Sequence, residues 1–205
     1  MLGLNIRKTS NLHKLAIIGN GFDLAHNYKT LYSSFVNSTS SPVLDKFKAY
    51  CDDEPAIKTW YDFENNINTL THSLYLQSLA EEQEYEENRN KVAELRNLFS
   101  ALSDLLIDYL QKEIANNPFE QKESIKKNLD SKTIAINFNY TDTAKKYIKN
   151  VIDIHGSLKE RDIILGYDYR DEPCLAQYED MCWSKTFCRE SLALRRFLRK
   201  WNKII

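Results

Sequence analysis

Glycine is scarce in this chain of 205 residues, which contains only five. Four of them, Gly19, Gly21, Gly156 and Gly166, lie just beyond short apolar runs. Glycine is favoured where the backbone turns tightly or approaches another group closely. A chain that uses it so sparingly is therefore expected to turn, or to meet a ligand, at these positions.

The sequence also lacks long apolar runs, and its first stretch, MLGLNIRKTSNLHK, lacks the apolar core of a signal peptide. Neither sign of charge dominates, because 28 basic and 29 acidic residues leave a formal net charge of -1. No strong field therefore favours nucleic acid or an anionic membrane surface. We expect a cytoplasmic protein that neither associates with a membrane nor binds nucleic acid directly.

Closely spaced cysteine pairs of the CxxC type are absent as well. The four cysteines are Cys51, Cys174, Cys182 and Cys188. Widely spaced cysteines in a cytoplasmic protein are expected to be reduced thiols, packed in the interior or at the surface. A zinc site formed by the last three is the alternative, and we predict no metal.

The first apolar run, Leu15 to Ile18, has the length and composition of a buried strand. The string GNGFD follows it, and apolar residues then recur at helical spacing from Phe22 to Phe35, with a break expected near Asn27. Strand, glycine turn and helix in this order are how many α/β folds bind phosphate. The start of the chain therefore predicts one βα unit with a nucleotide pocket at its turn.

A helical pattern occupies the middle of the chain, from Val43 to about Asn116. Its clearest part is a stripe of apolar residues at steps of three and four across five turns: Val92, Leu95, Phe99, Leu102, Leu106 and Tyr109. Residues 43–130 are predicted to form a helical insertion lobe. Residues 1–205 are predicted to form a single domain.

Strand signals return at Lys132 to Phe138, at Val151 to Ile154 and at Asp162 to Leu165, with a short helix expected over Asp142 to Asn150. Strand, helix and strand in such short order predict right-handed parallel crossovers. The predicted fold class is α/β, with a Rossmann-like parallel sheet that is flanked by helices and carries the large helical insertion after its first βα unit.

The GNGFD turn is the first candidate binding element. Gly19 and Gly21 would let backbone amides approach a phosphate or a ribose. Asp23 is expected either to cap the following helix or to hold a ribose hydroxyl. The dinucleotide fingerprint needs a third glycine where this chain has Leu24, which disfavours a hydride-transferring dehydrogenase. A strand-to-helix turn without any ligand is the alternative.

Two further motifs follow predicted strands. Asn137 and Asn139 bracket an aromatic residue in NFNYT, and His155 follows the run Val151 to Ile154. Ligands bind at the carboxyl edge of parallel sheets. Amides there can fix ribose hydroxyls or a water, and a histidine there can act as general base. The alternatives are turn-forming asparagines, a helix cap at Thr141, and a structural histidine.

Together the strings IIGNGFDLAH, WYDFE, INFNYT, IHGSL and IILGY resemble the bacteriophage abortive infection protein AbiH family. They also look like a divergent form of SIR2-type domains, in which a glycine turn, an asparagine motif and a histidine–glycine pair line an NAD pocket. The resemblance implies a SIR2-like fold with NAD as its substrate and with no metal. Asn139 would position the nicotinamide ribose and a water, and His155 would act as the base.

The resemblance further implies a set of residues that contact the dinucleotide: Gly19, Asn20, Gly21, Phe22, Asp23, His26, Asn137, Tyr140, Thr141, Gly156 and Ser157. The chain departs from the SIR2 pattern at Thr141, where many such motifs have aspartate, and nothing in it resembles the zinc ribbon of protein deacylases. Deacylation is therefore not expected.

In the WYDFE motif, Trp60 and Phe63 are expected to anchor the helical insertion, and Glu64 is a candidate additional acid or base. The predicted function is antiphage defence by an NAD⁺ glycohydrolase that depletes NAD during infection. One alternative is a non-catalytic NAD or nucleotide sensor or scaffold. Another is a nuclease or nucleotide hydrolase that uses Asp23, Glu64 and a divalent ion.

A toxic enzyme needs restraint, so a homo-oligomer or a complex with a phage-sensing partner protein is expected. The segment from Glu190 to Ile205 fits this expectation, because its apolar residues would line one side of a basic helix. Packing on the domain or on a partner protein is favoured over membrane-surface binding for this segment.

Overall fold

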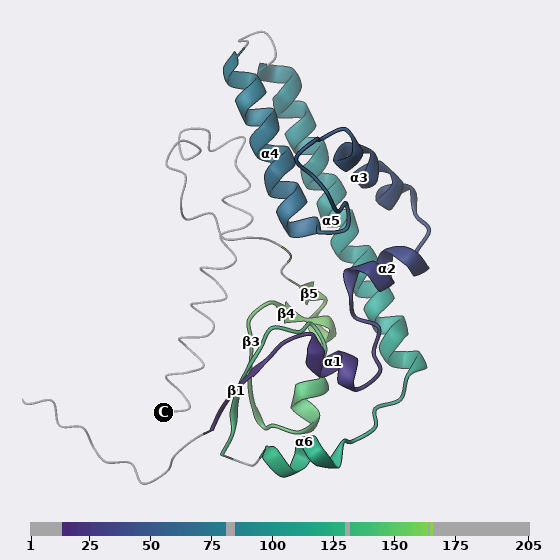
Figure 1. Ribbon diagram of the computed structural model, residues 1–205, viewed down its shortest axis with the longest axis vertical. Helices are drawn as coiled ribbons and strands as arrows, with labels where there is room; N and C mark the ends of the chain where they lie inside the picture. Colours follow the sequence, from purple (N-terminus) through teal and green to yellow (C-terminus); the bar gives the residue numbers. More distant parts are fainter. Residues whose placement is uncertain (1–13, 81–84, 130–131, 164, 166–205) are drawn as a thin grey trace, which may run out of the picture.

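The computed structural model describes residues 14–80, 85–129, 132–163 and 165. In this part of the chain a three-stranded parallel sheet is flanked by helices, and a group of longer helices extends away from it (Figure 1). The mixed α/β class predicted from the sequence is thereby confirmed.

The sheet has the strand order β1-β2-β3, and its strands are β1 (Leu15–Ile18), β2 (Ile134–Asn137) and β3 (Asn150–Asp153). Both pairings are parallel, and Ile18, Asn137 and Asp153 lie side by side in register. The three strands therefore end at the same level. The loops that follow them leave the sheet at one edge, although β1 and β2 are separated by more than a hundred residues.

The helices are α1 (Gly21–Ala25), α2 (Tyr32–Ser38), α3 (Pro42–Asp52), α4 (Phe63–Ala80), α5 (Tyr85–Asn116) and α6 (Glu123–Asn128). The break expected near Asn27 is real, because this residue has a left-handed backbone with φ 65° between α1 and α2. The long amphipathic helix also ends at Asn116, as the sequence predicts. Pro118 follows shortly after, and proline cannot continue a helix.

Helices α2 to α5, which we call the helical lobe, share a large apolar core. Phe35, Phe47, Phe63, Leu95 and Leu102 are each at most 1% exposed within it. The core also includes residues that follow the sheet, among them Leu158 and Ile163. Burial of a large apolar side chain stabilises a fold by about 1.5–3 kcal/mol, so this shared core ties the lobe to the carboxyl edge of the sheet.

A smaller apolar cluster lies against the sheet itself. Ile18 and Ala135 pack there with Ala144 and Ile148, which lie in and just after the 3₁₀ helix η2 (Thr143–Lys146). A regular helix expected over Asp142 to Asn150 is therefore replaced by one 3₁₀ turn, since β3 already begins at Asn150. Twelve residues separate β2 from β3, and the hydrogen-bonded loop at Asn139 takes up the first part of this crossover.

The prediction of a further parallel strand at Asp162 to Leu165 is wrong. β5 (Asp162–Ile163) pairs antiparallel with β4 (Gly156–Ser157) in a separate two-stranded sheet, and the 3₁₀ helix η3 (Leu158–Glu160) joins them. Only eight residues lie between β3 and β5. A parallel crossover needs a dozen or more, so this connection is too short for one.

Several expectations concern residues outside the described part of the chain: Gly166, Cys174, Cys182, Cys188 and the segment from Glu190 to Ile205. Cys51 is described, and its thiol is free and buried in the lobe core. Burial raises the pKa of this thiol to about 12, so Cys51 stays protonated and apolar. Within the described ranges, no helix is both long enough and apolar enough to cross a bilayer.

Candidate functional site

The turn after β1 is built without strained glycines. The amide of Phe22 donates to the Gly19 carbonyl at 2.9 Å, and neither Gly19 nor Gly21 has a positive φ. A Cβ added at either position would meet nothing within 4 Å. Packing within the described chain therefore does not require glycine here. The glycine with a positive φ is Gly156, at 78°.

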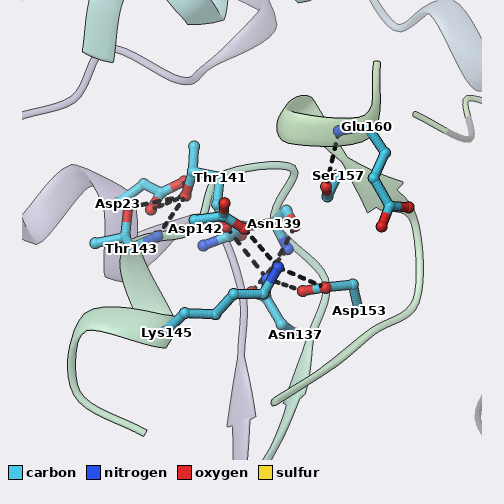
Figure 2. A network of polar contacts seen from close by, with 10 residues as sticks. All are labelled: Asp23, Asn137, Asn139, Thr141, Asp142, Thr143, Lys145, Asp153, Ser157 and Glu160. Atoms are coloured by element: carbon cyan, nitrogen blue, oxygen red, sulfur yellow. Dashed lines mark hydrogen bonds and ion pairs between the residues drawn. The ribbon is translucent and has the colours of Figure 1, made fainter. Parts of the chain in front are cut away.

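Asp23 is the buried carboxylate of this turn. Its side chain is 1% exposed, and the Thr141 hydroxyl donates to it, lying 2.7 Å from Oδ1 and 2.8 Å from Oδ2 (Figure 2). Burial raises the pKa of Asp23, while the hydrogen bonds from Thr141 and Thr143 and the nearby His26 act in the opposite direction. Asp23 does not cap helix α1. It joins the loop after β1 to the loop after β2.

The two asparagines of NFNYT have different surroundings. Asn137 is fully buried, and its Nδ2 donates to the carbonyl of Asn139 at 3.1 Å and to Asp153 Oδ1 at 3.0 Å. Its Oδ1 accepts from the Asn139 amide at 3.2 Å. Asn139 in turn donates from Nδ2 to the Gly19 carbonyl at 3.0 Å. Asn137 thus fixes the shape of the loop, and Asn139 connects that loop to the glycine turn.

His155 follows β3 and lies on the same edge of the sheet. Its half-buried ring is 5.7 Å from the ring of Phe138 and 6.3 Å from the ring of Tyr140, between centroids. Loops from all three strands therefore meet here, as expected for the carboxyl edge of a parallel sheet.

These loops and the helical lobe enclose a cavity of about 250 Å³. Its lining residues are Asn20, Asp23, Thr30, Leu31, Tyr32, Glu64, Leu110, Phe138, Asn139, Tyr140, Thr141 and His155. Among the residues that the structure describes, no lysine or arginine lines this cavity. The cavity thus combines amides, an imidazole and two carboxylates with aromatic walls.

The lobe contributes Tyr32 and Glu64 to this cavity. The Tyr32 hydroxyl lies 3.4 Å from Glu64 Oε1, to which it donates, and 3.3 Å from the Tyr140 hydroxyl. Burial raises the pKa of both tyrosines, and the Glu64 carboxylate raises them further. Both phenols are therefore neutral hydrogen-bonding groups at neutral pH.

Tyr32, Thr30 and Leu31 are cavity residues that sequence reasoning missed. The sequence pattern places Tyr32 within the helical spacing from Phe22 to Phe35, although the segment before Tyr32 is the connection between α1 and α2. The break expected at Asn27 was the signal that could have moved this segment into a loop near the site.

Seven predicted contact residues do not line the cavity: Gly19, Gly21, Phe22, His26, Asn137, Gly156 and Ser157. His26 is buried beside Tyr147, with Nε2 at 2.7 Å from the phenol oxygen, and stacks on Phe119. Phe22 packs in the cluster under the sheet. Gly156 lies in β4, and Ser157 Oγ accepts from the Glu160 amide at 3.4 Å, which caps η3 (Figure 2). These residues shape the surroundings of the site.

Phe63 belongs to the core of the lobe, and the partly buried Trp60 packs against that core, as their sequence motif predicts. Phe63 is 1% exposed, and Trp60 packs against it with 6.4 Å between ring centroids. Asp23 and Glu64, the two acids of the divalent-ion alternative, both line the cavity. In the part of the chain that the structure describes, however, no group of three or more His, Cys, Asp or Glu residues could hold a metal ion.

Comparison with known proteins gives one match. The family model described as "Bacteriophage abortive infection AbiH" matches residues 15–204. No curated protein and no solved structure matches the chain. The matched range includes every residue that lines the cavity and nearly the whole sequence. The chain therefore belongs to the bacteriophage abortive infection AbiH family.

Proposed function

We propose that this protein acts in abortive infection by hydrolysing NAD⁺ at the bond between nicotinamide and ribose. The observation that carries the proposal is that Asn139 and His155, from the ends of neighbouring parallel strands, line one cavity together with Asp23. Family membership supports the role in antiphage defence. The proposal includes a SIR2-like origin of the site, with the helical lobe as an insertion.

The cavity has the size for one end of the dinucleotide. Pockets that enclose drug-sized ligands span about 300–1,000 Å³, and this one measures about 250 Å³. Nicotinamide and its ribose would occupy the cavity. The diphosphate would extend out of it beside the open backbone at Gly19 and Gly21.

The proposed reaction breaks the C1′–N bond, and nicotinamide leaves with the electron pair as a neutral base. The ribose carbon becomes oxocarbenium-like, and a water oxygen then bonds to it. His155 accepts the proton that this water releases, while Asn139 orients the water or a ribose hydroxyl. The buried carboxylate of Asp23 stabilises the positive charge that develops on the sugar.

The test is release of nicotinamide from NAD⁺ by the purified chain, followed by chromatography. His155→Ala is expected to lower turnover by about 10²–10⁴-fold, the usual contribution of a general base. Asn139→Ala is expected to lower it as well. The matched control is His72→Ala, which removes a histidine of α4 that does not line the cavity.

Circular dichroism verifies that each variant is folded. Full turnover in folded His155→Ala protein would remove this residue from the mechanism. Calorimetric binding of NAD⁺ without any release of nicotinamide would assign the cavity to a sensor or scaffold instead. We also propose that the active form is a homo-oligomer or a complex with a phage-sensing protein, and mass photometry with and without infected-cell extract tests that.

A further inference from the structure

The charge of the cavity is one-sided. Asp23 enters it from α1 and Glu64 from α4, and no lysine or arginine lies among its described lining residues. Lys145, which Figure 2 shows beside the loop after β2, forms ion pairs with Asp142 at 2.5 Å and Asp153 at 2.8 Å. These two ion pairs neutralise the positive charge of Lys145.

Glu64 owes its position to the core of the lobe. The preceding residue, Phe63, is fixed among the rings of Tyr32, Phe35 and Phe47, with centroids 5.2, 6.0 and 5.5 Å away. The Tyr32 hydroxyl then donates to Glu64 on the cavity side. A carboxylate held by packing on one side and by a hydrogen bond on the other is positioned before any ligand arrives.

The negative charge of the Glu64 carboxylate changes the pKa of the neighbouring phenols. Burial raises the pKa of Tyr32 most, followed by the neighbouring Tyr140 and then the Glu64 carboxylate; burial also raises the pKa of Tyr140, and the Glu64 carboxylate raises it further. Each phenol resists ionisation because a second negative charge would stand close to the first. The same field attracts a cation that enters the cavity, and aromatic walls such as Phe138 and Tyr140 favour a cation as well.

A second cavity, of about 370 Å³, has a lining of mixed charge that includes Lys146 and Lys159, from η2 and η3, together with Asp142. The cavity that holds Asp23 and Glu64 differs from it, because its described lining contains carboxylates and no lysine or arginine. The smaller cavity is built for the end of a ligand that carries no negative charge.

We infer that Glu64 is a specificity-determining residue which recognises the positive charge of an oxidised nicotinamide ring, so that the cavity binds the oxidised dinucleotide in preference to the reduced one. This inference rests on the proposed function insofar as a nicotinamide dinucleotide is the ligand. It assigns to the helical lobe a direct part in ligand selection.

The test compares two ligands that the protein does not cleave. One is a carbocyclic analogue of NAD⁺, in which a methylene replaces the ring oxygen of the nicotinamide ribose and the ring keeps its charge. The other is NADH, whose nicotinamide ring is neutral. Dissociation constants are measured by calorimetry on the full chain in the presence of EDTA. We expect the cationic analogue to bind about tenfold more tightly.

Glu64→Gln keeps the shape of the side chain and removes its charge. We expect this variant to weaken binding of the cationic analogue about tenfold and to leave NADH binding within about twofold, which abolishes the preference. Glu64→Asp is expected to keep part of the preference. Glu123→Gln, in exposed α6, is the matched control and is expected to keep all of it.

Each other outcome overturns the inference. The inference fails if the wild type binds both ligands equally, or if the preference survives in Glu64→Gln. It also fails if Glu64→Gln loses affinity equally for both ligands, because that result indicates a merely structural role. Binding of neither ligand, or binding that requires Mg²⁺, would also overturn it. Nicotinamide release from NAD⁺ is scored separately on the same protein preparations: its absence contradicts hydrolysis alone, whereas release without charge preference contradicts only the role of Glu64.

Discussion

The two walls of the cavity are held in place by different forces. On the sheet side, Asp23, Asn139 and Thr141 are fixed by short hydrogen bonds between residues far apart in the chain. On the lobe side, Tyr32 and Glu64 are fixed mainly because their neighbour Phe63 is packed in an apolar core. Hydrogen bonds are directional, whereas apolar packing depends on volume.

This difference decides which changes each wall tolerates. The sheet-side wall is expected to be sensitive to loss of a single polar atom, since a buried partner is then left unsatisfied. The lobe-side wall is expected to be sensitive to loss of volume and tolerant of an isosteric apolar exchange. The variants below are ordered from the largest expected effect on stability to the smallest.

Phe63→Ala is expected to have the largest effect. The variant leaves a cavity among Tyr32, Phe35 and Phe47, and large-to-small changes of a buried phenylalanine cost about 3–5 kcal/mol in free energy of unfolding. Urea titration followed by circular dichroism measures this. Tyr61→Ala, at a position that is 36% exposed, is the control and should cost less than about 1 kcal/mol. A loss below about 1 kcal/mol in Phe63→Ala would contradict packing as the force that holds this wall.

Asn137→Ala probes the opposite wall. It deletes the amide that bonds to Asn139 and Asp153, and the loss of one buried partner costs about 1–3 kcal/mol. The control is Asn65→Ala, where an exposed amide bonds to Asp62 and the cost should stay within about 0.5 kcal/mol. Equal unfolding free energies for the two variants would show that the buried network does not stabilise the loop.

Asp23 makes the sheet-side wall dependent on pH. Burial raises its pKa in the folded state above the usual 3.8, so Asp23 ionises at a higher pH in the folded protein than in the unfolded chain. Stability is then lost as the pH rises above about 4, where the unfolded chain ionises first, and the loss is complete above the raised pKa. The cost is about 1.4 kcal/mol for each pH unit by which the pKa is raised.

Asp23→Asn cannot ionise and lacks this component. The wild type should therefore become less stable relative to the variant as the pH rises from about 4 to neutrality. Urea unfolding at a series of pH values measures the difference, and Asp45→Asn reports the effect of removing an exposed carboxylate. Curves for wild type and Asp23→Asn that stay parallel over this range would contradict the raised pKa.

The parallel sheet could be predicted because its signal is local. Runs such as Leu15 to Ile18 and Ile134 to Ile136 are apolar and bounded by turn residues. Once the strands are parallel, motifs that follow them must meet at one edge. The approach of Asn139 and His155 could therefore be foreseen, while their chemical roles stay predictions.

The lobe-side wall could not be foreseen in the same way. Where a helical lobe lies against a sheet depends on the packing of cores such as that around Phe63, and no local pattern encodes it. The sequence therefore indicates only weakly that Tyr32 and Glu64 line the cavity. The antiparallel pairing of β4 with β5 is different, because the eight-residue connection from β3 was readable as too short for a crossover.

Asn27 joins the two walls and gives the smallest expected effect. Its φ of 65° follows helix α1, and the amides of Asn27 and Tyr28 donate to the carbonyls of Leu24 and Asp23 at 3.0 and 3.2 Å. This is a Schellman-type helix end, at which glycine is preferred and asparagine is tolerated.

Asn27→Ala should cost about 1 kcal/mol in free energy of unfolding, because a left-handed backbone is unfavourable for alanine. Asn27→Gly should stay within about 0.5 kcal/mol of the wild type or exceed it. Since the turn precedes Tyr32, which lines the cavity, the alanine variant alone is also expected to weaken the NAD⁺ binding that we propose. If urea unfolding found alanine and glycine equivalent, this turn would not set the approach of the lobe to the sheet.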